Sequence, residues 1–184
     1  MSDERGKAAE VADAVVLRAT GVREHGGLRG EYFAWCVGED GSFKWEDRID
    51  NVVVTVGANQ LLDLFFDIGT VSSTKYMGLV ASSSGVFSTA DTMASHAGWT
   101  ESTIYTNASR VIPTWAAASA NSKASTGAVF NIGSSGIVGG AFMVSTSSAV
   151  GSTVGTLYSA GAFTGGPKVV SSGDSLTVTY TGSV

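Results

Sequence analysis

The sequence predicts an all-β protein: a β-sandwich or barrel-like domain with one short helix and an extended N-terminal arm. After Val71, clusters of Gly, Ser and Thr recur at intervals of about ten residues, which is the turn spacing of β-sandwiches and barrels. A β-branched run at residues 51–56 leads into the one stretch with clear helical periodicity. The first 28 residues carry an apolar face that is too short to be stable alone.

Length and composition agree with one domain and an arm. The chain has 184 residues and a mass of 18.8 kDa, and 43% of its residues are hydrophobic, which excludes a disordered chain. No run approaches the ~18 to 20 apolar residues that cross a bilayer, and the N-terminus lacks the pattern of a signal peptide. We therefore expect no membrane partner, an arm at residues 1–28 and a β-sandwich domain at residues 29–184.

The arm mixes Ala, Val and charged residues. Val11, Val15 and Val16 are spaced for one turn of helix, and several glycines follow them. We expect the arm either to be ordered by docking on a neighbouring molecule or to be a frayed terminus.

An aromatic-rich hairpin is expected to open the domain. Residues 31–37 predict a strand, residues 38–41 a turn that contains an Asp-Gly dipeptide, and residues 42–47 the returning strand. The β-branched run at residues 51–56 predicts a further strand that ends at a glycine.

The helix is predicted near residues 57–66. Leu61 stands four residues before Phe65. Leu62 and Phe66 repeat this spacing, so the two pairs form an apolar stripe on one side of the helix. We expect this stripe to plug the core and to carry no chemistry.

The rest of the chain predicts a series of short strands. Alternation is clearest in the last of them, where Leu176, Val178 and Tyr180 alternate with threonines, so that one face enters the core. The predicted strands cover residues 75–80, 102–105, 110–115, 127–132, 139–145, 156–163 and 175–181.

Charge is distributed unevenly along the chain. Of the 27 charged residues, 18 lie in the first 50 positions and 9 in the remaining 134, where Ser and Thr supply 40 positions. An ordinary soluble domain is roughly 25% charged. A surface with so few charges predicts that copies of the chain or a partner cover much of it. The net charge of -5 has the wrong sign for a protein that wraps a phosphate backbone, so no nucleic-acid partner is expected.

The chain offers little catalytic chemistry. His96 lies near Asp91 and Ser95, so a Ser/His/Asp hydrolase is one alternative. The G-x-S-x-G motif, which would expose Ser95 on a sharp turn as a nucleophile, is missing. We therefore favour a structural, hydrogen-bonded role for His96. Metal ligands are scattered and phosphate-binding glycine motifs are missing, so no catalytic, metal or cofactor residue is predicted. Cys36 lies in an apolar run, so we expect its side chain to be buried as a small hydrophobic group.

Several segments form an ordered pattern: WED at 45–47, NVV at 51–53, GANQLLD at 57–63, DTMASHAGWTE at 91–101, GTLY at 155–158, GAF at 161–163 and SGDSLTVTY at 172–180. In this order they resemble a group of small virion proteins of tailed bacteriophages, which are associated with capsid decoration (cement) proteins. The resemblance covers about residues 30–181 and leaves out the arm.

The resemblance implies a non-enzymatic protein that binds the outer surface of the major capsid lattice and stabilises the head. It would be made in the host bacterial cytoplasm and reside on the virion as a homo-oligomer, with a trimer as the expected form. The alternative is a tail or fibre protein that contacts host glycan, with Trp99 or Trp115 as a platform. The residues expected to contact the capsid or other subunits are Val11, Val15, Val16, Leu17, Arg18, Arg23, Arg29 and Trp99.

Overall fold

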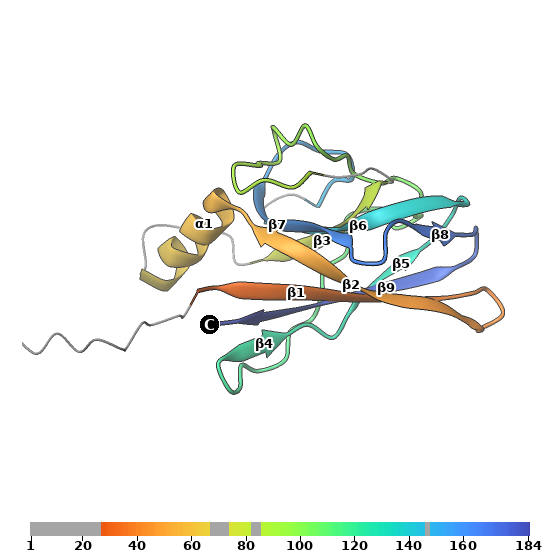
Figure 1. The fold of residues 1–184 in the computed structure, drawn as a ribbon, viewed down its shortest axis with the longest axis horizontal. Helices are drawn as coiled ribbons and strands as arrows, with labels where there is room; N and C mark the ends of the chain where they lie inside the picture. The colour runs from red at the N-terminus through yellow and green to blue at the C-terminus, as the bar shows by residue number, and fades with distance from the viewer. Residues whose placement is uncertain (1–26, 67–73, 82–85, 146–147) are drawn as a thin grey trace, which may run out of the picture.

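The computed structural model describes residues 27–66, 74–81, 86–145 and 148–184, and in these residues it confirms an all-β fold with one helix (Figure 1). All but the last two residues of the predicted arm lie outside the described ranges. The elements are β1 (Arg29–Val37), β2 (Phe43–Val53), α1 (Thr55–Phe66), β3 (Lys75–Ala81), β4 (Ser122–Ala124), β5 (Ala128–Asn131), β6 (Gly136–Ser145), β7 (Thr156–Phe163), β8 (Lys168–Val170) and β9 (Ser175–Ser183).

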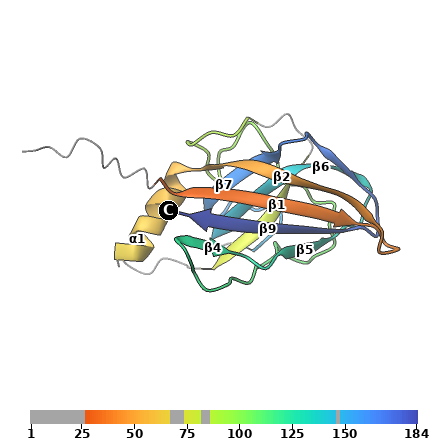
Figure 2. The same cartoon turned by 60° about the horizontal axis from the view of Figure 1, so that its bottom comes forward.

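The strands form one antiparallel sheet that curls into a half-barrel (Figures 1 and 2). Its order is β3-β6-β7-β2-β1-β9-β4, with β5 also paired to β9 and β8 to β6. The long strand β2 makes the curl, because its first part pairs with β1 while its last part, from Ile49 onward, pairs with β7. The start of β1, the end of β9 and helix α1 consequently lie at the same end of the sheet (Figure 2).

Alternating side chains fill the inside of the curl. In β9, Leu176, Val178 and Tyr180 are at most 2% exposed, which confirms the alternation that the sequence predicts. A second, smaller cluster of buried side chains surrounds Trp99. Cys36 belongs to the main cluster and is fully buried, so its prediction is confirmed. Burial raises the pKa of the Cys36 thiol to about 12.

The strand predicted at residues 51–56 is not a separate one, because residues 51–53 end β2 and α1 begins at Thr55. Two other predicted strands do not form. Residues 102–105 and 110–115 connect to the sheet only through isolated bridges, among them those at Tyr105 and Val111. The strands β4 and β8 were not predicted, because three residues are too few to show an alternating pattern.

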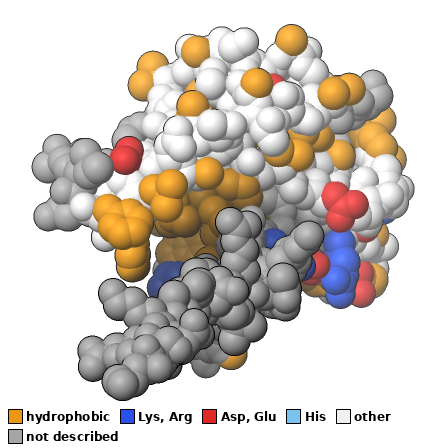
Figure 3. All heavy atoms as spheres, turned by 60° about the vertical axis from the view of Figure 1, so that its left-hand side comes forward, with side chains coloured by type: hydrophobic (Ala, Val, Ile, Leu, Met, Phe, Trp, Pro, Cys, Tyr) orange, Lys and Arg blue, Asp and Glu red, His pale blue; other side chains and the backbone are white. Residues whose placement is uncertain are grey.

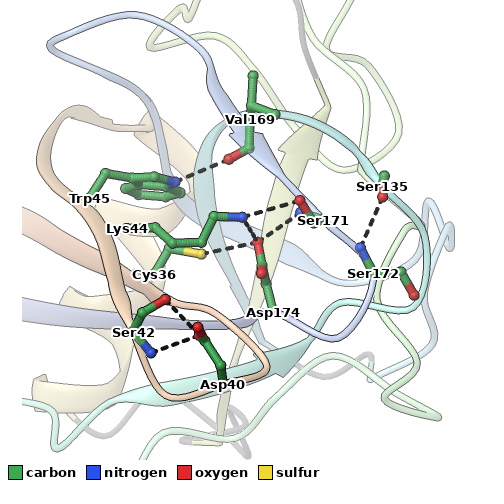
Figure 4. Close-up of polar contacts among 10 residues, drawn as sticks. All are labelled: Cys36, Asp40, Ser42, Lys44, Trp45, Ser135, Val169, Ser171, Ser172 and Asp174. Atoms are coloured by element: carbon green, nitrogen blue, oxygen red, sulfur yellow. Dashed lines mark hydrogen bonds and ion pairs between the residues drawn. The ribbon is translucent and has the colours of Figure 1, made fainter.

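Asp174 fastens the end of the sheet that lies opposite α1 (Figure 4). Its carboxylate is 4% exposed and accepts hydrogen bonds from Nζ of Lys44 at 2.6 Å and from the backbone N–H of Ser171 at 2.7 Å. Burial alone would raise the pKa of this carboxyl, but the two donors outweigh burial and hold the pKa below its ordinary value. The turn between β8 and β9 is thereby tied to β2.

Acid is expected to weaken the fold between about pH 4 and pH 2 through a second carboxylate, Asp47. Burial raises its pKa, but hydrogen bonds from Lys168, from Thr164 and from backbone N–H groups outweigh burial and lower the pKa from 3.8 to about 2. A folded-state pKa below the unfolded value stabilises the protein above the unfolded pKa, and this contribution is lost as the pH falls through the folded pKa. Solvent screening limits the contribution to about 1–2 kcal/mol.

Urea denaturation at pH 7, 4 and 2.5 measures this effect. The free energy of unfolding should fall between the two lower pH values, and it should fall less in Asp47→Asn. An equal fall in both proteins would show that other groups cause the acid sensitivity.

Candidate functional site

Helix α1 packs on β7 through its small and polar side. At Gly57, any side chain would place its Cβ 2.5 Å from the Cα of Tyr158, so the glycine allows the helix to approach the strand closely. Gln60 is 7% exposed and donates its amide N–H to Oγ of Ser145 at 2.7 Å. The amide oxygen of Gln60 accepts a hydrogen bond from Nζ of Lys75 at 2.9 Å. The inner side of α1 therefore holds a glycine and a hydrogen-bonded glutamine.

The hydrophobic side of α1 faces away from the sheet. Leu62, Phe65 and Phe66 are 54%, 79% and 67% exposed, and the two phenyl rings meet edge to face at 4.9 Å. We call these three residues the α1 patch. The prediction that the apolar stripe plugs the core is wrong, because Gly57 and Gln60 occupy the inner side and helical periodicity then turns the stripe outward.

An apolar cavity of about 470 Å³, which we call the end cavity, lies beside α1 at the same end of the half-barrel. Figure 3 brings this end forward, and hydrophobic side chains gather there around a hollow. Leu61 and Leu64 of α1 contribute to one wall. The other apolar residues of the lining are Leu28, Trp115, Ala118, Met143, Tyr158, Tyr180 and Val184.

Two lysines also line the end cavity. Nζ of Lys75 donates to Gln60 and lies 5.9 Å from the centre of the Tyr158 ring, and burial lowers the pKa of this lysine. Nζ of Lys123 donates to the backbone carbonyl of Ala116 at 3.0 Å. Within the described part of the chain, neither lysine forms an ion pair with a carboxylate. The cavity therefore combines an apolar wall with two ammonium groups that have no acidic partner there.

The tyrosines of the cavity add no charge. Burial raises the pKa of both Tyr158 and Tyr180, so both phenols stay protonated at neutral pH. The ring of Tyr180 is 2% exposed, and its hydroxyl lies against Gly30, where a larger residue would collide with it. Among the side chains of the described lining residues, only those of the two lysines are charged at neutral pH.

The structure separates the residues that the sequence singles out as contacts. Arg29, the first residue of β1, is exposed next to Leu28 at the end cavity. Trp99 is 2% exposed, stacks on His96 with ring centres 4.0 Å apart and donates from Nε1 to Asp91 at 3.0 Å. Its prediction as a contact or as a sugar platform is wrong, since the indole is used inside the domain. Outside the described residues lie Val11, Val15, Val16, Leu17, Arg18 and Arg23.

The loop around His96 is held by structural hydrogen bonds. Nδ1 of His96 donates to the carbonyl of Trp99 at 2.9 Å. The carboxylate of Asp91 instead accepts from the indole of Trp99 and from the backbone N–H of Ser88. The imidazole and the carboxylate thus have separate partners and do not form the relay of a Ser/His/Asp triad, which agrees with the structural interpretation of this histidine.

Within the ranges that the structure describes, no three His, Cys, Asp or Glu side chains gather as metal ligands. No helix in the same ranges is long and apolar enough to cross a bilayer. Comparison of the chain with protein-family models, curated proteins and solved structures gives no match. The α1 patch and the end cavity are therefore the candidate binding surfaces of the described residues.

Proposed function

We propose that this chain is a decoration protein of a tailed-phage capsid, which binds the outer surface of the major capsid lattice and stabilises the head. The α1 patch is the observation that carries the proposal. A solitary protein in water gains nothing by turning Phe65 and Phe66 outward, whereas an assembling protein buries them against a neighbour. The ordered sequence segments supply the phage context.

The sparse charge supports the same proposal. Only 9 of the 134 residues from Asn51 onward are charged. Neighbouring molecules can therefore cover this surface without burying many charged side chains, which would be costly. We infer that copies of the chain form a homo-oligomer, a trimer in the simplest case, and that the oligomer seats on the major capsid protein.

Repetition over the lattice would turn modest contacts into firm attachment. Each additional contact made by one oligomer occurs at a high effective concentration, so individual affinities need not be high. A protein that binds the assembled shell but not its separated subunits also stabilises the shell by linkage. Head stabilisation then follows from binding alone and needs no enzymatic step.

Replacing Phe65 by Ser is expected to weaken self-association and head binding by about 10- to 100-fold, because burial of an aromatic side chain contributes about 1.5–3 kcal/mol. Stability of the single chain should change little, since the ring is 79% exposed. Phe43→Ser is the matched control: Phe43 is 63% exposed and begins β2, at the end of the sheet away from α1 (Figure 1).

Sedimentation of the purified chain measures self-association, and co-sedimentation with heads that lack the protein measures attachment. Copy number per virion then separates the two virion roles: hundreds of copies support decoration, whereas a few tens indicate a tail or fibre. A chain that remains monomeric at millimolar concentration and does not bind heads contradicts the proposal.

A further inference from the structure

We propose that residues 11–17 of the N-terminal arm dock in the end cavity of the same molecule. The first described residues place the arm at this cavity. Leu28 lines the cavity, and Arg29 then pairs with Ser183 to begin β1 (Figure 2). The chain outside the described core thus starts at the rim of an apolar hollow.

The length of the arm suits a return to the cavity. Ten residues, 18–27, separate the proposed segment from Leu28. Ten residues span at most about 33–36 Å when fully extended. This linker is therefore long enough to turn back and bring residues 11–17 into the cavity. A short tether also gives the segment a high effective concentration at its site, which allows a weak contact to be well occupied.

The segment is apolar where the cavity is apolar. Val11, Val15, Val16 and Leu17 offer branched aliphatic side chains within seven residues, and no other part of the arm has this density. The cavity is lined by Leu64 and other apolar side chains. Mutual burial removes both surfaces from water.

The charges of the two partners are complementary. Glu10 and Asp13 border and interrupt the apolar segment, and Arg18 follows it, so two acids against one base leave residues 10–18 with a net charge of -1. Lys75 and Lys123 line the cavity and have no carboxylate partner among the described residues. A segment with acids beside its apolar side chains therefore fits this cavity better than a neutral or basic peptide would.

The inference goes beyond the proposed function and does not depend on it. The arm would fill the end cavity, whose wall contains Leu61 and Leu64, whereas the α1 patch lies on the outward side of the helix. Docking would leave the patch free for other molecules.

A nitroxide label on the full chain tests the proposal. Val15→Cys supplies the attachment point, and the native Cys36 should not react because it is fully buried and its thiol pKa is raised to about 12. The measurement is the NMR spectrum of the ¹⁵N-labelled protein. Paramagnetic relaxation by the nitroxide should weaken the amide signals of Leu64 and Gly182, which line the cavity. Ser172, in the turn before β9, should keep its signal.

Matched variants make the result specific. Leu17→Asp in the labelled chain should restore the cavity signals, while Ser2→Asp, which adds the same charge outside the segment, should not. Undiminished cavity signals, or equal restoration by both variants, would overturn the proposal. So would attenuation seen only after mixing ¹⁵N-labelled chains without nitroxide with nitroxide-bearing chains at natural abundance, because a second copy would then be the occupant.

Discussion

Replacing Arg110 by Met is expected to lower the free energy of unfolding by about 3–5 kcal/mol. The guanidinium is fully buried and donates to both carboxylate oxygens of Glu101, at 2.9 and 2.7 Å, and to the carbonyl of Ser152 at 2.7 Å. Its carbon also lies 5.2 Å from the centre of the Phe142 ring. Methionine fills a similar volume but leaves the carboxylate of Glu101 buried without its cation.

A second substitution removes the unpaired negative charge of Glu101. Glu101 also accepts from the backbone N–H of Gly151 at 2.7 Å and from the hydroxyl of Tyr105 at 3.3 Å, so its oxygens are needed even without the arginine. Adding Glu101→Gln to Arg110→Met should therefore recover part of the loss, because glutamine keeps an acceptor and carries no charge. Urea denaturation of the single and double variants measures this recovery.

An exposed arginine provides the control. Arg48 pairs with Glu31 at 3.1 Å, but the two side chains are 67% and 53% exposed. Arg48→Met should cost no more than about 1 kcal/mol, since water screens the pair and solvates the remaining carboxylate. Similar losses in the two variants would mean that the Glu101–Arg110 pair is not isolated from water.

The same ion pair explains why some predicted strands form and others do not. In β9 the alternation of Leu176 and Val178 with threonines describes the whole environment of the strand, so the pattern suffices. Residues 102–115 also contain spaced apolar side chains, but Glu101 and Arg110 anchor the segment through a buried charge pair. A periodicity argument treats both residues as solvent-facing and cannot anticipate such an anchor.

The candidate site was only half predictable for a related reason. Helical periodicity at residues 58–66 correctly predicts α1, but it does not say which side meets the sheet. The decision is made by Gly57 and Gln60, a small residue and a polar one on the side opposite the α1 patch. The end cavity is even harder to predict from the sequence, because its lining includes Leu28 and Val184, which lie near opposite ends of the described chain.

Gly57→Val is expected to cost about 2–3 kcal/mol and to move α1 away from β7. A Cβ at this position would lie 2.5 Å from both the Cα and the carbonyl oxygen of Tyr158, which belong to backbone and cannot rotate aside. Asn59→Val is the control: it puts the same side chain on an exposed position of the same helix, where the loss of helix propensity costs at most about 0.7 kcal/mol. Denaturant unfolding measures both, and equal losses would contradict close packing at Gly57.

The value of this variant lies in its second effect, on assembly. Gly57 belongs to neither the α1 patch nor the lining of the end cavity, yet it sets the position of the helix that carries the patch and contributes to the cavity wall. If assembly uses the patch, Gly57→Val should weaken both folding and association, whereas Phe65→Ser should weaken association alone. A Gly57→Val chain that loses stability but associates normally would mean that the contact between subunits does not require α1 in its native position.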